Sequence, residues 1–207
     1  KNANVTADVM GLFQECYEPI TYAQMAERLW YIPIDRVKHE LVTEKSIVMI
    51  EQETYFYAPN FPISTHELAA LQRAMHRRIE DEGFLVARSL REVMQIHCPN
   101  AVMDTAGWKD WGIRNVMAWL LRDQFDFNGV VICAKGAGMD THMGFRSYCK
   151  AHDRVTMDEL KDLCAQLDVS GIYWDSVLAE TVRISLQIFT DMFRTLTFKK
   201  ENMEAAA

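Results

Sequence analysis

The chain has 207 residues and a formal net charge of −7, and apolar residues make up 49% of it. That apolar content suffices for packed cores, while no run of eighteen apolar residues predicts a membrane span and no basic segment before an apolar one predicts a secretion signal. We therefore expect a cytoplasmic protein, or a fragment of one. The five cysteines are irregularly spaced, which favours reduced thiols over a disulfide framework.

The first sixty residues predict three helices followed by a β-hairpin. Apolar residues at helical spacing indicate helices over 5–16, 22–30 and 34–45, and β-branched and aromatic residues indicate the hairpin over 46–58. Thr21 suits the N-cap of the second helix, and Pro33 suits the start of the third. The third helix would bury one apolar stripe, made of Ile34, Val37, Leu41 and Val42. The hairpin would turn at Gln52-Glu53.

Residues 61–139 predict a second module, which opens with a long helix. Ser64-Thr65 followed by Glu67 resembles a capping box one residue out of register, and Gly83 would end the helix. A further helix is expected over 88–96, then a loop from Pro99 to Gly107. The last elements expected are a helix over 108–125 and, after Asn128-Gly129, a strand over 130–133.

Residues 140–207 predict a third, helical module. Thr156 and Glu159 form a T-x-x-E capping box at the start of a helix that would end near Leu167. A second helix over 177–188 and an extended end over 194–198 would follow. That second helix offers only Arg183 as a cation, so this module is better suited to packing or dimerisation than to holding a phosphate backbone.

The three modules repeat one order: a short helix, an aromatic turn, a second helix and a β-rich end. This pattern resembles tandem winged helix-turn-helix proteins, and the residues that carry the likeness are Ile20-Thr21, Met25, Leu29, Pro33, Val37, Leu41, Val155-Thr156, Leu160 and Leu163. The resemblance implies a mainly α fold with short β-hairpins, built of tandem modules over 1–60, 61–139 and 140–207. Winged helices occur both in transcription regulators and in scaffolds that bind only proteins, so the fold leaves the function open.

Double-stranded DNA is the first partner that the resemblance implies. In a winged helix the second helix of the pair lies in the major groove, and its outward residues reach the bases and phosphates. The residues placed there would be Arg36, Lys38, His39 and Lys45 in the first module, and Lys109, Arg114 and Arg122 in the second. We therefore expect a non-enzymatic, transcription-regulator-like protein.

A protein-binding scaffold is the alternative. The net charge is acidic, the predicted wing Glu51-Gln52-Glu53 is acidic, and three carboxylates share the first basic helix, Asp35, Glu40 and Glu44. Apolar residues near the wing, Tyr55, Tyr57 and Phe61, favour a protein partner or a second copy of the chain. A continuous positive face linking Arg36 to Arg114 would favour DNA, whereas scattered cations would favour the scaffold.

No catalytic motif is apparent. The chain has no phosphate-binding G-x-x-x-x-G-K-[ST] loop, and Gly136-Ala137-Gly138 lacks the context of a dinucleotide site. The pairs His97-Cys98 and Cys149…His152 lack the spacing of zinc knuckles. We therefore expect no enzymatic activity, no cofactor and no metal.

Overall fold

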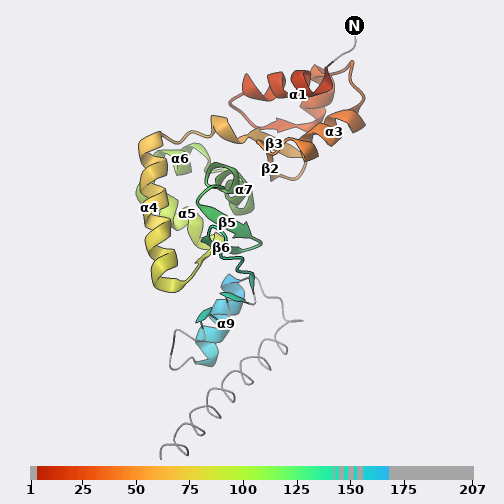
Figure 1. The fold of residues 1–207 in the computed structure, drawn as a ribbon. Coiled ribbons are helices and arrows are strands. Elements are labelled where there is room, and N and C mark those ends of the chain that lie inside the picture. Colours follow the sequence, from red (N-terminus) through yellow and green to blue (C-terminus); the bar gives the residue numbers. More distant parts are fainter. Residues whose placement is uncertain (1–3, 142, 145–146, 149–151, 153–155, 168–207) are drawn as a thin grey trace, which may run out of the picture. The chain divides into compact units, whose positions relative to one another are not determined.

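The computed structural model describes residues 4–141, 143–144, 147–148, 152 and 156–167 (Figure 1). The described part is mainly helical and contains two antiparallel sheets of three strands each. The chain divides into two compact units, residues 1–140 and residues 141–207, which we describe separately.

The first sixty residues form the three predicted helices and the predicted hairpin. The elements are α1 (Val5–Gln14), β1 (Ile20–Thr21), α2 (Tyr22–Arg28), α3 (Ile34–Thr43), β2 (Ile47–Glu51), β3 (Thr54–Tyr57) and a short 3-10 turn, η1 (Ala58–Asn60). The strands are ordered β1-β3-β2, with Ile20 opposite Tyr55 and Ile47 opposite Tyr57. Thr21 caps α2 as predicted, because its backbone N–H donates to Gln24 Oε1 at 2.8 Å and its Oγ1 accepts the Gln24 N–H at 3.3 Å.

The following residues to Asp140 form a similar order of elements, with one more helix between the first strand and the hairpin. They form α4 (Thr65–Glu82), β4 (Leu85–Val86), η2 (Ala87–Ser89), α5 (Leu90–His97), α6 (Pro99–Asp104), α7 (Asp110–Leu120), β5 (Phe125–Asn128) and β6 (Val131–Ala134). The strand order is β4-β6-β5, so in both sheets the first strand pairs with the last and the hairpin lies at one edge. Gly83 ends α4 with a left-handed φ of 84°, a conformation that glycine adopts without cost.

Three local predictions for this segment were wrong. The predicted loop 99–107 contains α6, because Pro99 occupies the first helical position, where a missing N–H does no harm. The predicted helix 108–125 ends at Leu120, and Phe125–Asn128 is a strand paired with β6 across the Asn128-Gly129 turn. The capping box of α4 is in register, since Ser64 and Glu67 cap each other reciprocally.

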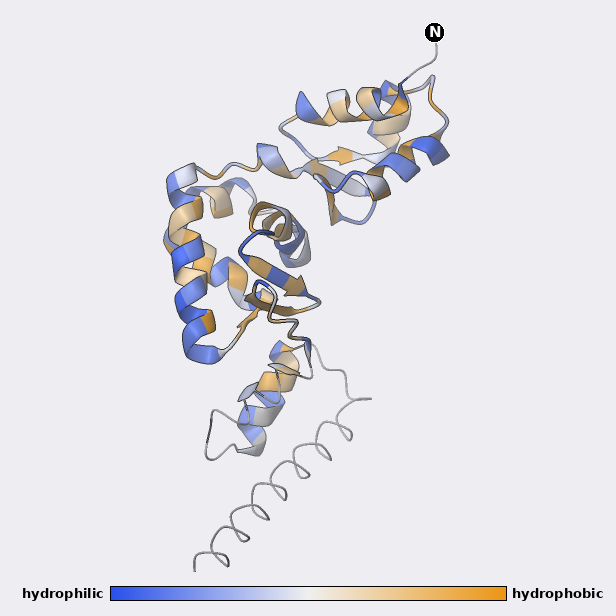
Figure 2. Cartoon of the chain, in the orientation of Figure 1, coloured by the Kyte–Doolittle hydropathy of each residue, from blue (hydrophilic) through white to orange (hydrophobic). Residues whose placement is uncertain are grey.

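Two hydrophobic clusters hold residues 1–140 together. The first joins α1, α2, α3 and the start of the hairpin through Val9, Phe13, Met25, Val37 and Ile47. The second fills the space between α4, α5, α6, α7 and the second sheet, and it also contains Ile50, Phe56 and Ala58 of the first sixty residues. Figure 2 shows the solvent side of α4 as largely hydrophilic, as expected for a helix that buries one stripe. Ile50, Phe56 and Ala58 thus belong to the core of the segment that follows them, whereas Tyr55 and Tyr57 pack against the first cluster.

In the second unit, the described helix is α9 (Met157–Gln166). Its predicted capping box is confirmed, because Thr156 Oγ1 accepts the Glu159 N–H at 3.2 Å while Glu159 Oε2 accepts the Thr156 N–H at 2.7 Å. Leu163, Cys164 and Leu167 are buried. The helix expected over 177–188 and the extended end over 194–198 lie outside the described residues.

Candidate binding surfaces

Helix α7 packs directly on strand β2 at the point where Gly112 meets Ile50. A Cβ on Gly112 would come within 2.7 Å of the Ile50 Cα and closer still to its carbonyl oxygen, so only glycine permits this approach. One turn further along α7, the Asn115 amide donates to the Met49 carbonyl at 2.9 Å. Lys109 Nζ, just before the helix, lies 3.8 Å from Glu51 Oε1. Figure 1 shows the orange hairpin lying beside the green α7.

Aromatic side chains also pack between the first sixty residues and the segment that contains α7. The ring of Trp108 meets Phe56 and Phe61 edge-on, with centroid distances of 4.9 Å and 5.9 Å. Phe61 is only 5% exposed, so the expectation that it presents an apolar surface near the wing is wrong. Tyr55 is half-buried and its hydroxyl lies 2.8 Å from that of Tyr22; burial, and then this hydrogen bond, raises the pKa of Tyr55.

The four basic residues predicted on the third helix of the first module are all exposed. Lys38 Nζ lies 5.4 Å from the centre of the Tyr22 ring, and Lys45 Nζ donates to the Val42 carbonyl at 3.2 Å near the end of α3. Among the described residues, the side chains of Arg36 and His39 have neither an ion pair nor a hydrogen bond. These two side chains of α3 remain available to a partner.

The three predicted cations of the second module bind groups within the protein. Lys109 pairs with Glu51, and Arg122 donates to the Trp119 carbonyl at 2.6 Å while its guanidinium lies 4.2 Å from the centre of the Trp119 ring. Arg114 is half-buried and donates to two backbone carbonyls of the β5–β6 hairpin, Phe127 at 2.8 Å and Gly129 at 2.7 Å. Burial lowers the pKa of this guanidinium.

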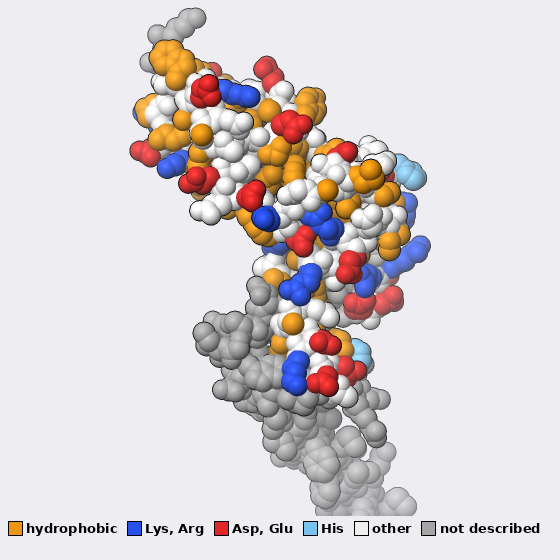
Figure 3. Space-filling view, turned by 180° about the vertical axis from the view of Figure 1, so that it is seen from behind, with side chains coloured by type: hydrophobic (Ala, Val, Ile, Leu, Met, Phe, Trp, Pro, Cys, Tyr) orange, Lys and Arg blue, Asp and Glu red, His pale blue; other side chains and the backbone are white. Residues whose placement is uncertain are grey.

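Arg114 is therefore a structural arginine, and the predicted positive face does not reach it. It fastens the hairpin to α7 in place of facing outward. On the face seen in Figure 3, Lys and Arg side chains alternate with Asp and Glu side chains. The charge pattern on that face is scattered.

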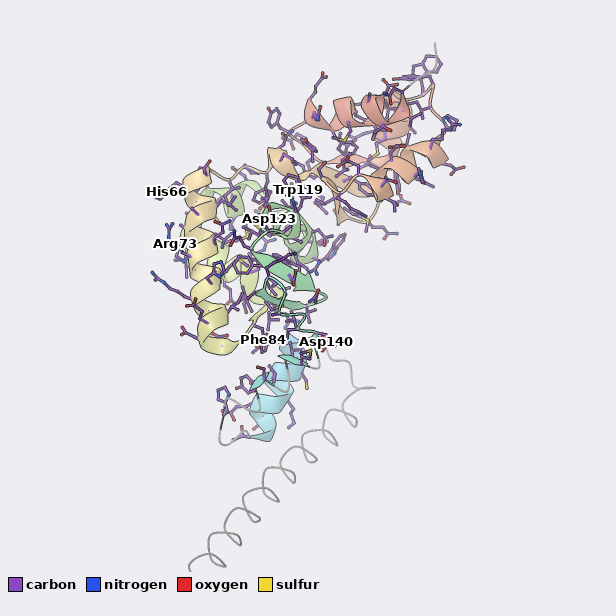
Figure 4. All side chains as sticks on the ribbon, viewed as in Figure 1. His66, Arg73, Phe84, Trp119, Asp123 and Asp140 are labelled. Carbon is purple, nitrogen blue, oxygen red and sulfur yellow. The ribbon has the colours of Figure 1, made fainter. Side chains whose placement is uncertain are left out.

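A groove lies where α7, β2 and the end of α3 meet, and we call it the seam groove. It has a volume of about 420 Å³, and its main lining residues are Val42, Lys45, Met49, Ala118, Trp119 and Arg122. Val42, near the end of α3, is 73% exposed and Met49, in β2, is 40% exposed, so both apolar side chains are accessible to a partner. Glu44 also lines it, and hydrogen bonds from the Ser46 hydroxyl and N–H lower the pKa of that carboxyl. Figure 4 labels Trp119 near the end of α7.

The seam groove was not predicted from the sequence. Val42 was assigned to the buried stripe of its helix, which is wrong because only Val37 and Leu41 of that helix are buried. The sequence did contain a signal that Val42 is exposed, because it directly follows Leu41. Two neighbouring positions of a helix cannot both lie at the centre of one narrow buried stripe. Nothing local indicated that Met49 and Trp119 would meet there.

Within the described residues, no other chemistry stands out. They hold no group of three His, Cys, Asp or Glu side chains placed to bind a metal, and their cysteines Cys16, Cys98, Cys133 and Cys164 form no disulfide with one another. Burial, and then the Glu67 carboxylate, raises the pKa of Cys98 to about 11, so this thiol stays protonated at neutral pH. In the same part of the chain, no helix has the length and apolar character to cross a membrane. Comparison with protein-family models, with curated proteins and with solved structures gives no match to this chain.

Proposed function

We propose that this chain is a non-enzymatic protein-interaction module, built of tandem winged helices and acting in the cytoplasm, that binds an apolar segment of a partner protein in the seam groove. The observation that carries the proposal is the packing of α7 on β2. In a DNA-reading winged helix the helix in the position of α7 must be free to enter the major groove. Here one side of it is covered by the preceding module.

The order of the elements supports the winged-helix assignment. In both halves of residues 1–140 a leading helix is followed by a strand, then helices, then a hairpin, and the first strand pairs with the last. This order is the one expected of a helix-turn-helix followed by a wing. The repeat places α3 and α7 in equivalent positions, so the covering of α7 affects one of two candidate recognition helices.

The composition of the seam groove supports a protein partner. Val42, Met49 and Trp119 offer an apolar floor, while Lys45 and Arg122 form a polar rim. An aromatic and aliphatic centre with a polar rim is typical of protein–protein contacts. A phosphate backbone would find little to bind there, because both cations already donate to backbone carbonyls.

Binding of double-stranded DNA through α3 is the second candidate. It is favoured by the exposed side chains of Arg36 and His39, which lack partners among the described residues. Against it, Asp35, Glu40 and Glu44 lie on or next to the same helix and cancel its positive charge. Each phosphate contact adds about −0.9 to the slope of log K against log salt, so the few phosphate contacts that α3 can make would give only weak binding.

A mobility-shift assay on random duplex DNA at about 50 mM salt separates the two candidates, because electrostatic binding is strongest at low salt. We expect that Arg36→Glu does not change the mobility of the DNA relative to the wild-type chain. A shift that Arg36→Glu abolishes and that Val42→Ser leaves unchanged would replace the proposal with DNA binding. Val42→Ser is the matched control because Val42 lies on the same helix, exposed, and carries no charge.

A further inference from the structure

A second groove lies between α4 and α5, and it shares no residue with the seam groove. Its volume is about 530 Å³, and its main lining residues are Arg73, Arg77, Arg78, Val93, Ile96 and His97. We call it the α4–α5 groove. Figure 4 labels Arg73 in the middle of α4.

The helical spacing of residues on α4 explains why arginines line the α4–α5 groove. On α4 the lining positions follow one another at helical intervals, so Ala70, Arg73, Ala74 and Arg77 form a single stripe. The two alanines are too short to fill the space beside α5, and the two arginines reach past them. Val93 and Ile96 line the opposite wall from α5. The groove is thus lined by apolar side chains of both helices and by arginines of α4.

The cations of the α4–α5 groove are largely unneutralised. Arg73 and Arg77 are exposed, and among the described residues their side chains have neither an ion pair nor a hydrogen bond. Arg78 lies 3.4 Å from Glu82 in an exposed pair, which contributes little. His97, in the last turn of α5, also lines the groove.

From this geometry we infer that the α4–α5 groove binds an acidic, amphipathic peptide segment of a partner protein. Carboxylates of the segment would pair with Arg73 and Arg77, for which a planar guanidinium is well shaped. Its apolar side chains would cover Ile96, which is 75% exposed, and fill the hollow above the alanines. A nucleic-acid backbone fits less well, since its phosphates offer no apolar side chain to cover Ile96.

Fluorescence anisotropy on the full chain tests the inference. The probes are a short labelled peptide of alternating Glu pairs and Leu, a peptide with Lys in place of Glu, a peptide with Ser in place of Leu, and random duplex DNA. We expect the Glu–Leu peptide to bind saturably, and Arg73→Glu with Arg77→Glu to weaken it at least about tenfold, or about 1.4 kcal/mol. The same double variant should bind the Lys peptide better than the wild-type chain does.

The matched control is Arg28→Glu with Arg36→Glu, which makes the same charge change on exposed residues elsewhere and should leave the affinity for the Glu–Leu peptide within about twofold of the wild-type value. Ile96→Ser should weaken the Leu peptide but not the Ser peptide. Absence of saturable peptide binding, or equal losses in the two charge-reversal variants, would overturn the inference. Duplex DNA bound in preference to the peptide and lost in Arg73→Glu with Arg77→Glu would reassign the groove to nucleic acid. Because Met49 and Val42 take no part here, failure of this test leaves the proposal for the seam groove standing.

Discussion

Gly112 of α7 lies against the backbone of Ile50 in β2, with no room for a side chain between them. This contact joins the first sixty residues to the segment that follows. Gly112→Ala should therefore force the two elements apart and destabilise the protein by about 1–3 kcal/mol, the usual cost of overpacking. Urea denaturation measures the change. Gly11→Ala is the matched control, since a Cβ added to Gly11 in α1 would meet nothing within 4 Å, and this variant should gain up to about 1 kcal/mol. Equal stabilities of the two variants would contradict the packing.

Arg114 fastens the β5–β6 hairpin to α7 through two backbone carbonyls. Arg114→Met keeps the length of the side chain but removes these two hydrogen bonds and a third one to Asn115 Oδ1, so we expect a loss of about 2–3 kcal/mol and faster amide exchange in residues 125–134. Arg36→Met, which removes an exposed arginine from α3, should change the stability by less than about 0.5 kcal/mol. If both variants melted at the same temperature, Arg114 would be a surface residue after all.

The capping box of α4 predicts that removing the Ser64 hydroxyl destabilises the protein more than removing the Ser89 hydroxyl. Ser64 Oγ accepts the Glu67 N–H at 3.2 Å and donates to Glu67 Oε2 at 2.6 Å, whereas Ser89 precedes α5 without a capping hydrogen bond from its side chain. Ser64→Ala should cost about 1 kcal/mol and Ser89→Ala almost nothing. Thermal denaturation at one pH compares them. A larger loss in Ser89→Ala would be the opposite of what this geometry requires.

The hydrogen bonds of the Asp126 carboxylate should make the stability of the fold fall at acid pH. Hydrogen bonds from Lys135 Nζ at 2.8 Å and then from the Gly136 N–H at 2.8 Å lower the pKa of this carboxyl below its ordinary 3.8. Because the pKa is lower in the folded state, the stabilisation is complete above pH 3.8 and is lost as the pH falls below it. Asp126→Asn should thus flatten the fall in stability in that acid range. Asp123→Asn, at an exposed residue nearby, should leave the fall unchanged; a flattening there as well would show that the effect is not specific to Asp126.

The sequence predicts those elements of the fold whose interactions lie between residues close together in the chain. Thr21 with Gln24 and Thr156 with Glu159 satisfy their caps within four residues, so these helix starts were predictable. The strand Phe125–Asn128 was missed because Phe125 was assigned to the end of the preceding helix and Asn128 to the turn after it. Phe125 and Phe127 alternate with polar residues as in a strand, but four residues are a weak signal without the pairing with β6.

The candidate site was less predictable than the fold, because it depends on contacts between distant residues. Isolated patterns place Arg114 on a helix surface, but they do not show that the hairpin carbonyls of Phe127 and Gly129 fold back onto it. Likewise, a glycine within a helix such as Gly112 costs stability unless another backbone packs closely against it. The residues near Gly112 in the sequence do not indicate that this backbone belongs to Ile50. The groove follows from that long-range contact.

Photo-crosslinking from position 49 tests the proposed function most directly. Met49 replaced by p-benzoylphenylalanine places a reactive group in the seam groove, and Met103 replaced in the same way places one on α6, where the methionine is 71% exposed outside the groove. Irradiated in the cells that produce the chain, position 49 should give a discrete adduct that protease removes and nuclease does not, while position 103 gives none. A nuclease-sensitive adduct at position 49, or the same adducts from both positions, would contradict a protein-binding seam.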